Sequence, residues 1–123
     1  MSARQDRVAT AIRKEVARIV LQDMRDPRLA TVTITSVEVT ADWSMATVHV
    51  SALGGDAELK AAVESLNNAA GFVRRELAPT MTMRHCPALR FVPDDSARKA
   101  QRLEELFRED RAELGEPRES PES

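Results

Sequence analysis

Few side chains in this 123-residue chain could carry out catalysis, and they do not converge. His85 and Cys86 are neighbours, but adjacent strand residues point to opposite sides, so the imidazole cannot readily activate the thiol. His49 alternates with apolar strand residues and is expected on the outer face of a sheet. Asp94 and Asp95 precede a predicted helix, and carboxylates at such positions commonly cap the first backbone amides. No further metal ligands accompany them in the sequence. The sequence therefore predicts neither an enzyme nor a bound cofactor or metal.

A second group of side chains suits phosphate. The chain has 18 basic residues, mostly arginine, whose forked guanidinium matches phosphate oxygens. Near the N-terminus, five cations fall within an arc of about 80° on a helical wheel: Arg4, Arg7, Lys14, Arg18 and Arg25. Further along the chain lies a cluster of four: Arg74, Arg75, Arg84 and Arg90. We interpret both groups as contacts to a nucleic-acid backbone; the alternative is ordinary solvated arginines that reflect genome composition.

The segment between these groups predicts a kinked helix pair. One apolar face runs through residues 57–77, yet the middle of that stretch has low helix propensity, so we expect two helices joined by a kink at 68–71. Small residues at the bend would let a phosphate backbone approach closely, and two amides could add hydrogen bonds. A kink that serves packing alone is the alternative. The residues concerned are Asn67, Asn68, Ala69, Ala70 and Gly71.

The other elements that must position these residues follow from periodicity, turn residues and caps. We expect a helix over 4–24, a strand over 31–40 with a bulge near Thr35 and Ser36, a hairpin connection at 41–44, a strand over 45–52, a strand at about 84–92 and a final helix over 96–114. This order predicts an α+β fold with helices on one face of a three-stranded sheet. Aromatic residues make up 3% and tyrosine is absent, which argues against a platform for base stacking.

Composition and charge place the chain among small globular domains. Residues 1–102 carry 15 basic and 12 acidic residues, a net charge of +3, whereas residues 103–123 carry 3 and 8, a net charge of −5. We predict a domain over 1–95, the C-terminal helix over 96–114 and a disordered acidic tail over 115–123. The lone cysteine, and the lack of a signal peptide or a long apolar run, predict a cytoplasmic protein without membrane association.

Four motifs, in order, resemble the bacterial ribosome-binding factor A family from Arg7 to about Phe107. They are RVATAIRKEVARIV, DPRLATVTITSVEVTADWSMATVHVS, LNNAAGFVRRELA and MRHCPALRFVPDDS. The resemblance implies a KH-like fold of type II, in the order α-β-β-α-kink-α-β, with an additional C-terminal helix. In that family an Ala-x-Gly kink replaces the usual GxxG loop, and Ala69-Ala70-Gly71 fits this pattern.

The resemblance also implies a function. It implies a non-catalytic assembly factor that binds the free small (30S) ribosomal subunit and its 16S rRNA, promotes late maturation and 5′-end processing, and has a role in cold adaptation. We further expect a monomer, with a ribosome-associated GTPase as a candidate for its release. By this resemblance the RNA-facing residues are Asn67, Asn68, Ala69, Ala70, Gly71, Arg74, Arg75 and Arg84, to which the helix-face argument adds Arg4, Arg7, Lys14 and Arg18.

The modest positive charge of the body departs from the strong charge typical of an RNA-binding domain. Tight binding to naked RNA is therefore not expected, and a composite surface of RNA and protein is the better prediction. The alternative function is a small protein-interaction module that docks a partner helix through the kinked pair.

Overall fold

The computed structural model describes residues 2–81, 85–94 and 104–108 of the chain. Its first helix, α1 (Ala3–Asp23), begins with a capping box. The backbone N–H of Gln5 donates to the Ser2 hydroxyl at 3.1 Å, and the Ser2 N–H donates to the Gln5 side chain at 3.0 Å. The predicted helix over 4–24 is confirmed, but Arg25 lies beyond its last residue.

A short 3-10 helix, η1 (Pro27–Leu29), leads from α1 into the sheet. Strands β1 (Thr33–Val39) and β2 (Met45–Ser51) pair antiparallel. The register shifts between Ile34 and Ser36, which confirms the predicted bulge. At the tip of the hairpin Trp43 has φ 63°, a left-handed conformation uncommon for a bulky residue.

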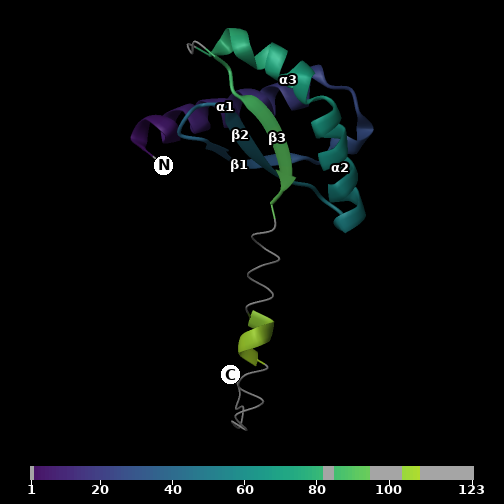
Figure 1. Ribbon diagram of the computed structural model, residues 1–123. Coiled ribbons are helices and arrows are strands. Elements are labelled where there is room, and N and C mark those ends of the chain that lie inside the picture. Colours follow the sequence, from purple (N-terminus) through teal and green to yellow (C-terminus); the bar gives the residue numbers. More distant parts are fainter. Residues whose placement is uncertain (1, 82–84, 95–103, 109–123) are drawn as a thin grey trace.

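The kinked helix pair is present. Helix α2 (Asp56–Asn68) is followed by α3 (Ala70–Leu77), and Ala69 is the single non-helical residue between them. Figure 1 shows α3 turning sharply away from α2 at this point. Gly55 occupies the N-cap of α2, and its N–H donates to the Glu58 side chain at 2.8 Å.

The last strand, β3 (Ala88–Pro93), lies parallel to β2. It begins four residues later than predicted, because Pro87 has no N–H to contribute to the ladder. The first bond to the neighbouring strand runs from the Ala88 N–H to the Ser44 carbonyl at 3.0 Å. A second short 3-10 helix, η2 (Ala78–Thr80), follows α3 on the way to this strand.

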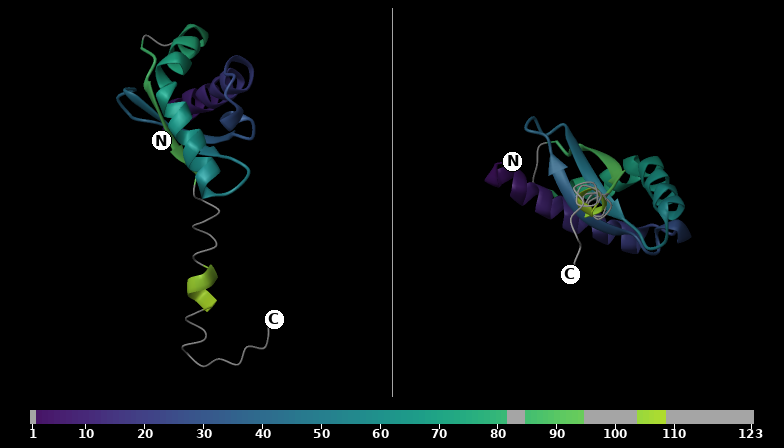
Figure 2. Two further views of the ribbon diagram at one scale, coloured as in Figure 1. Left: turned by 90° about the vertical axis from the view of Figure 1, so that its right-hand side faces the viewer. Right: turned by 90° about the horizontal axis from the view of Figure 1, so that it is seen from below.

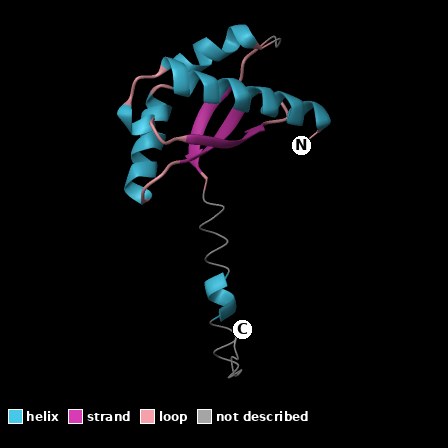
Figure 3. Ribbon diagram, turned by 180° about the vertical axis from the view of Figure 1, so that it is seen from behind, coloured by secondary structure: helices cyan, strands magenta, loops and turns pink. Residues whose placement is uncertain are grey.

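The sheet has the order β1-β2-β3, and the helices cover one of its faces. Figure 2 (left) shows the strands on one side and α1 on the other, and in Figure 3 α1 crosses in front of the upper ends of the strands. The core between the two layers includes Ile12, Val48, Leu66 and Leu77 at 0% exposure and Phe91 at 1%. The predicted α+β, KH-like fold is thus confirmed.

The C-terminal part of the chain is described over one short stretch only. Residues 104–108 are helical, whereas the rest of the helix predicted over 96–114 and the tail predicted over 115–123 lie outside the described residues. In the described part of the chain, no helix combines the length and the apolar character needed to cross a membrane.

Candidate nucleic-acid interface

The outward flank of α1 carries the first group of predicted RNA-facing cations. Arg7 and Lys14 are exposed and form no ion pair with any residue in the described ranges. Arg18 differs from them, because its Nε lies 3.0 Å from Glu15 Oε1 and its Nη1 lies 3.9 Å from Asp23 Oδ2. Of the predicted RNA-facing cations on this helix, Arg7 and Lys14 are therefore the best placed to meet an external phosphate.

Arg4 is engaged with the hairpin tip. Its guanidinium carbon lies 5.4 Å from the centroid of the Trp43 ring, a cation–π contact that joins the start of α1 to the turn between β1 and β2. The Gln5 side chain strengthens this junction by donating to the Val39 carbonyl at 2.9 Å. Arg4 thus has a structural partner, although its side chain is exposed.

Asn67 and Arg74 flank the kink and hold other parts of the chain. The Asn67 amide nitrogen donates to the Phe91 carbonyl at 2.8 Å, and its amide oxygen accepts from the Phe91 N–H at 2.8 Å. One side chain thereby satisfies both backbone groups of a residue in β3, the edge strand of the sheet. Arg74 donates from Nε at 3.1 Å and from Nη2 at 2.6 Å to the Cys86 carbonyl. Both residues have structural contacts that the sequence did not predict.

Gly71 and Arg75 lie together on the exposed side of α3. Gly71 does not have a positive φ, and a Cβ built on it would lie 3.8 Å from Arg75 Nη1, an ordinary contact distance. Nothing within the described fold therefore requires glycine here. Glycine even destabilises a helix interior by about 1 kcal/mol relative to alanine. The small residue and the adjacent guanidinium suit the close approach of an external anionic group.

The remaining predicted residues of the kink are placed as follows. Asn68 is exposed, whereas Ala69 and Ala70 are half-buried at the bend. Arg84 lies outside the described residues. Arg90 does not join the cluster with Arg74 and Arg75 as expected: it alternates with buried Leu89 and Phe91 in β3 and lies on the outer face of the sheet, away from the helices.

The cations Arg7 and Lys14 of α1 and the exposed side of α3 both lie opposite the buried faces of their helices. On a helical wheel Arg7 and Lys14 lie roughly opposite the buried stripe of α1, and Gly71 and Arg75 lie roughly opposite Val73 and Leu77 of α3. All four residues are exposed, so each lies on the side of its helix that faces away from the core. We call Arg7, Lys14, Gly71 and Arg75 the helical-side surface.

The geometry offers no catalytic alternative among the described residues. Burial raises the pKa of the Cys86 thiol, so the thiol stays protonated and is a weak nucleophile. His49 lies on the outer sheet face, as expected, with Nε2 3.1 Å from Glu38 Oε1. Within residues 2–81, 85–94 and 104–108, no three His, Cys, Asp or Glu side chains come together in a way that could hold a metal ion.

One polar cluster was missed by the sequence reasoning. The Asp26 carboxylate accepts hydrogen bonds from the Arg28 backbone at 3.0 Å and from Arg28 Nη2 at 2.8 Å, and also accepts one from the buried Ser65 hydroxyl. The Arg28 side chain foremost, and then Ser65, hold the pKa of Asp26 far below its usual range. The proline after Asp26 signalled a turn, but the contact with α2, 39 positions away, leaves no local signal.

Comparison with known proteins identifies relatives of this chain. A family model described as ribosome-binding factor A matches residues 4–107. The ribosome-binding factor A of Desulforamulus reducens is 40% identical over 117 residues, which cover 95% of this chain and 98% of that protein.

A crystal structure and a fitted homology model share the fold. The crystal structure of ribosome-binding factor A from Thermus thermophilus superposes with a TM-score of 0.65 at 27% identity, covering 72% of this chain and 94% of that one. A homology model of the Thermus thermophilus factor, fitted into a cryo-EM map of its complex with the 30S subunit, gives a TM-score of 0.62 at 26% identity and covers 74% of this chain and 96% of that one.

Proposed function

This chain belongs to the ribosome-binding factor A family, and we propose that it binds the small ribosomal subunit as an assembly factor. The Thermus thermophilus relative fitted into the map of a 30S complex supports the choice of partner. The contact would be made with 16S rRNA. Within this family setting, the proposed role includes late maturation and 5′-end processing of that RNA in the cytoplasm, with a contribution to growth in the cold and release by a ribosome-associated GTPase.

The observation that carries this proposal is the helical-side surface. It combines exposed cations that lack an ion-pair partner in the described part of the chain with a glycine that the fold itself does not require. Backbone phosphates are recognised by such cations, and close approach is favoured where side chains are small. The role we assign is one of binding, without chemistry on the RNA.

The alternative of a module that docks a partner helix has less support. Helix docking needs an exposed apolar stripe. In α3 the apolar Val73 and Leu77 are both buried at 0% exposure, and Phe72 packs against the core. None of the exposed positions around the kink carries a large apolar side chain; they are Asn67, Asn68, Gly71, Arg74, Arg75 and Glu76. This polar surface suits RNA better than an amphipathic helix.

Salt-dependent binding to purified small subunits tests the proposal, with two matched arginine variants. Arg75→Ala removes a cation from the helical-side surface, whereas Arg90→Ala removes one from the outer sheet face. For each lost phosphate contact the slope of log K against log salt falls by about 0.7 to 0.9. We therefore expect Arg75→Ala to weaken binding and flatten the slope by that amount, and Arg90→Ala to leave both unchanged.

Equal effects of the two arginine variants would contradict the proposed surface, because they would report net charge alone. If both variants bind like the wild type, and the wild-type slope of log K against log salt is near zero, phosphate recognition is contradicted altogether. Thermal unfolding of both variants serves as the control for folding, since both arginines are exposed.

A further inference from the structure

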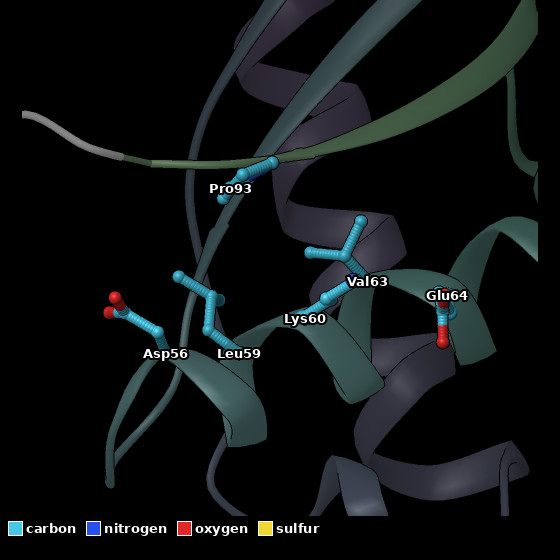
Figure 4. Close-up of a pocket in the computed structure, with 6 residues that line it drawn as sticks. All are labelled: Asp56, Leu59, Lys60, Val63, Glu64 and Pro93. Carbon is cyan, nitrogen blue, oxygen red and sulfur yellow. The ribbon is translucent and has the colours of Figure 1, made fainter.

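An apolar hollow lies outside the proposed RNA surface, between α2 and the end of β3. Its volume is about 300 Å³, and its apolar lining consists of Leu59, Val63 and Pro93. Figure 4 shows Leu59 and Val63 projecting from α2 toward Pro93 on the strand above. Both side chains remain half-buried. The hollow therefore leaves apolar surface uncovered at the point where the strand layer meets α2.

The polar residues around the hollow are charged. They are Asp56, Lys60 and Glu64, all from α2. Lys60 is exposed and forms no ion pair within residues 2–81, 85–94 and 104–108. Two carboxylates and one ammonium thus surround the apolar lining, so a covering segment needs large apolar side chains and can place an acidic group favourably only beside Lys60.

The helical stretch 104–108 has this combination. Leu106 is 49% exposed and Phe107 is 60% exposed, so both are large apolar side chains without cover. They are preceded directly by Glu104 and Glu105. Neighbouring positions on a helix lie about 100° apart, so Leu106 and Phe107 can enter one hollow together while the glutamates stay at its rim.

We infer that the helical stretch 104–108 docks in cis on the Leu59–Val63–Pro93 hollow, with Leu106 and Phe107 inside and Glu104 or Glu105 near Lys60. The chain leaves the body at the hollow itself, because Pro93 is both the last residue of β3 and part of the lining. Nine residues, 95–103, connect the two parts, and nine residues of extended chain span up to about 30 Å. Docking therefore requires that the helix predicted over 96–114 does not run through this connection. A connection this short gives an effective concentration in about the millimolar range, so a modest contact suffices for docking.

Methyl NMR spectra of the full-length protein, labelled at leucine and valine, test this inference. In Phe107→Ser we expect the methyl signals of Leu59 and Val63 to shift, because the aromatic ring leaves the hollow. Leu21→Ser is the matched control: Leu21 is 80% exposed on α1, so its loss removes another exposed apolar side chain, one that does not line the hollow. Unchanged Leu59 and Val63 signals in Phe107→Ser would overturn the inference.

The reciprocal variant reads out the other partner. Val63→Ser leaves the sequence of 104–108 intact, and we expect amide exchange over 104–108 to become about tenfold faster as docking is lost. Exchange rates equal to those of the wild type would overturn docking on this hollow. Wild-type methyl shifts that depend on protein concentration would also overturn the inference in its stated form, since they would show that the helix docks on a second copy.

Discussion

Replacing Gly71 with alanine should stabilise the fold and weaken binding to the small subunit. A gain in stability together with a loss of binding distinguishes a glycine needed for an external partner from a glycine needed for folding. Gly71 is exposed in α3, has no positive φ, and offers a new Cβ an ordinary contact of 3.8 Å with Arg75 Nη1. The methyl group therefore meets neither strain nor a clash within the described protein.

The size of the stabilising effect follows from backbone entropy. A glycine-to-alanine change at a compatible helical position contributes about 0.4–1 kcal/mol to the free energy of unfolding. For a domain of this size, 1 kcal/mol corresponds to about 4–8 °C, so we expect the Tm to rise by about 2–8 °C. In a closely packed interface an added methyl group costs about 1–3 kcal/mol, which weakens binding by roughly fivefold to more than a hundredfold.

Gly54→Ala is the matched control for the folding effect. Gly54 has φ +102°, and a Cβ there would lie 3.0 Å from Glu58 Cγ, so the same substitution should lower the Tm. Thermal unfolding and co-sedimentation with free small subunits measure the two quantities. A lower Tm in Gly71→Ala would show that the fold does not have room for a methyl group at this position. A higher Tm with unchanged subunit binding would refute the close approach of RNA.

Three further changes test the contacts around the core. Asn67→Ala should lower the free energy of unfolding by about 1–3 kcal/mol, because it leaves the Phe91 N–H and C=O without their amide partner. A denaturant melt measures this loss. A loss no larger than the one in Asn68→Ala would contradict the prediction. Phe91→Ala should cost about 3–5 kcal/mol, since Phe91 is 1% exposed, and a smaller loss in the same melt would mean that the core can collapse around the gap. The depressed pKa of Asp26 stabilises the fold above the ordinary aspartate pKa, about 3.9, and this contribution is lost as pH falls below that value. Asp26→Asn should therefore make the Tm less dependent on pH below about 4 than in the wild type, and parallel Tm curves would rule out this contribution.

Local signals were sufficient for most of the fold. The low helix propensity before Gly71 located the break that the structure places at Ala69, and the change in apolar phase near Thr35 located the bulge. Arg90 could also have been assigned correctly, since it alternates with the apolar Leu89 and Phe91, and alternation in a strand fixes the face. Its grouping with the arginines of α3 followed charge alone and ignored that geometry.

The contacts that the sequence did not reveal join residues far apart in the chain. Asn67 and Phe91 are 24 positions apart, and Asp26 and Ser65 are 39 positions apart. An asparagine before a kink can hydrogen-bond either to a ligand or to the backbone of another segment. Which of the two Asn67 does depends on where β3 lies, and the sequence around Asn67 does not show that. The sequence could therefore indicate that the kink is special without showing which of its side chains hold the fold.

The kink serves both purposes because a helix distributes neighbouring residues to different sides. Asn67 and Arg74 turn toward β3 and the segment before it, where each contacts backbone groups, while Gly71 and Arg75 turn to solvent. Opening the bend would break the hydrogen bonds between the Asn67 amide and Phe91 and those between the Arg74 guanidinium and Cys86 at the same time. The glycine and the cation beside it are thus held on a rigid support, so little conformational entropy remains to be lost when a partner binds. A structural role for Asn67 and Arg74 therefore strengthens the case for Gly71 and Arg75 as the residues that meet RNA.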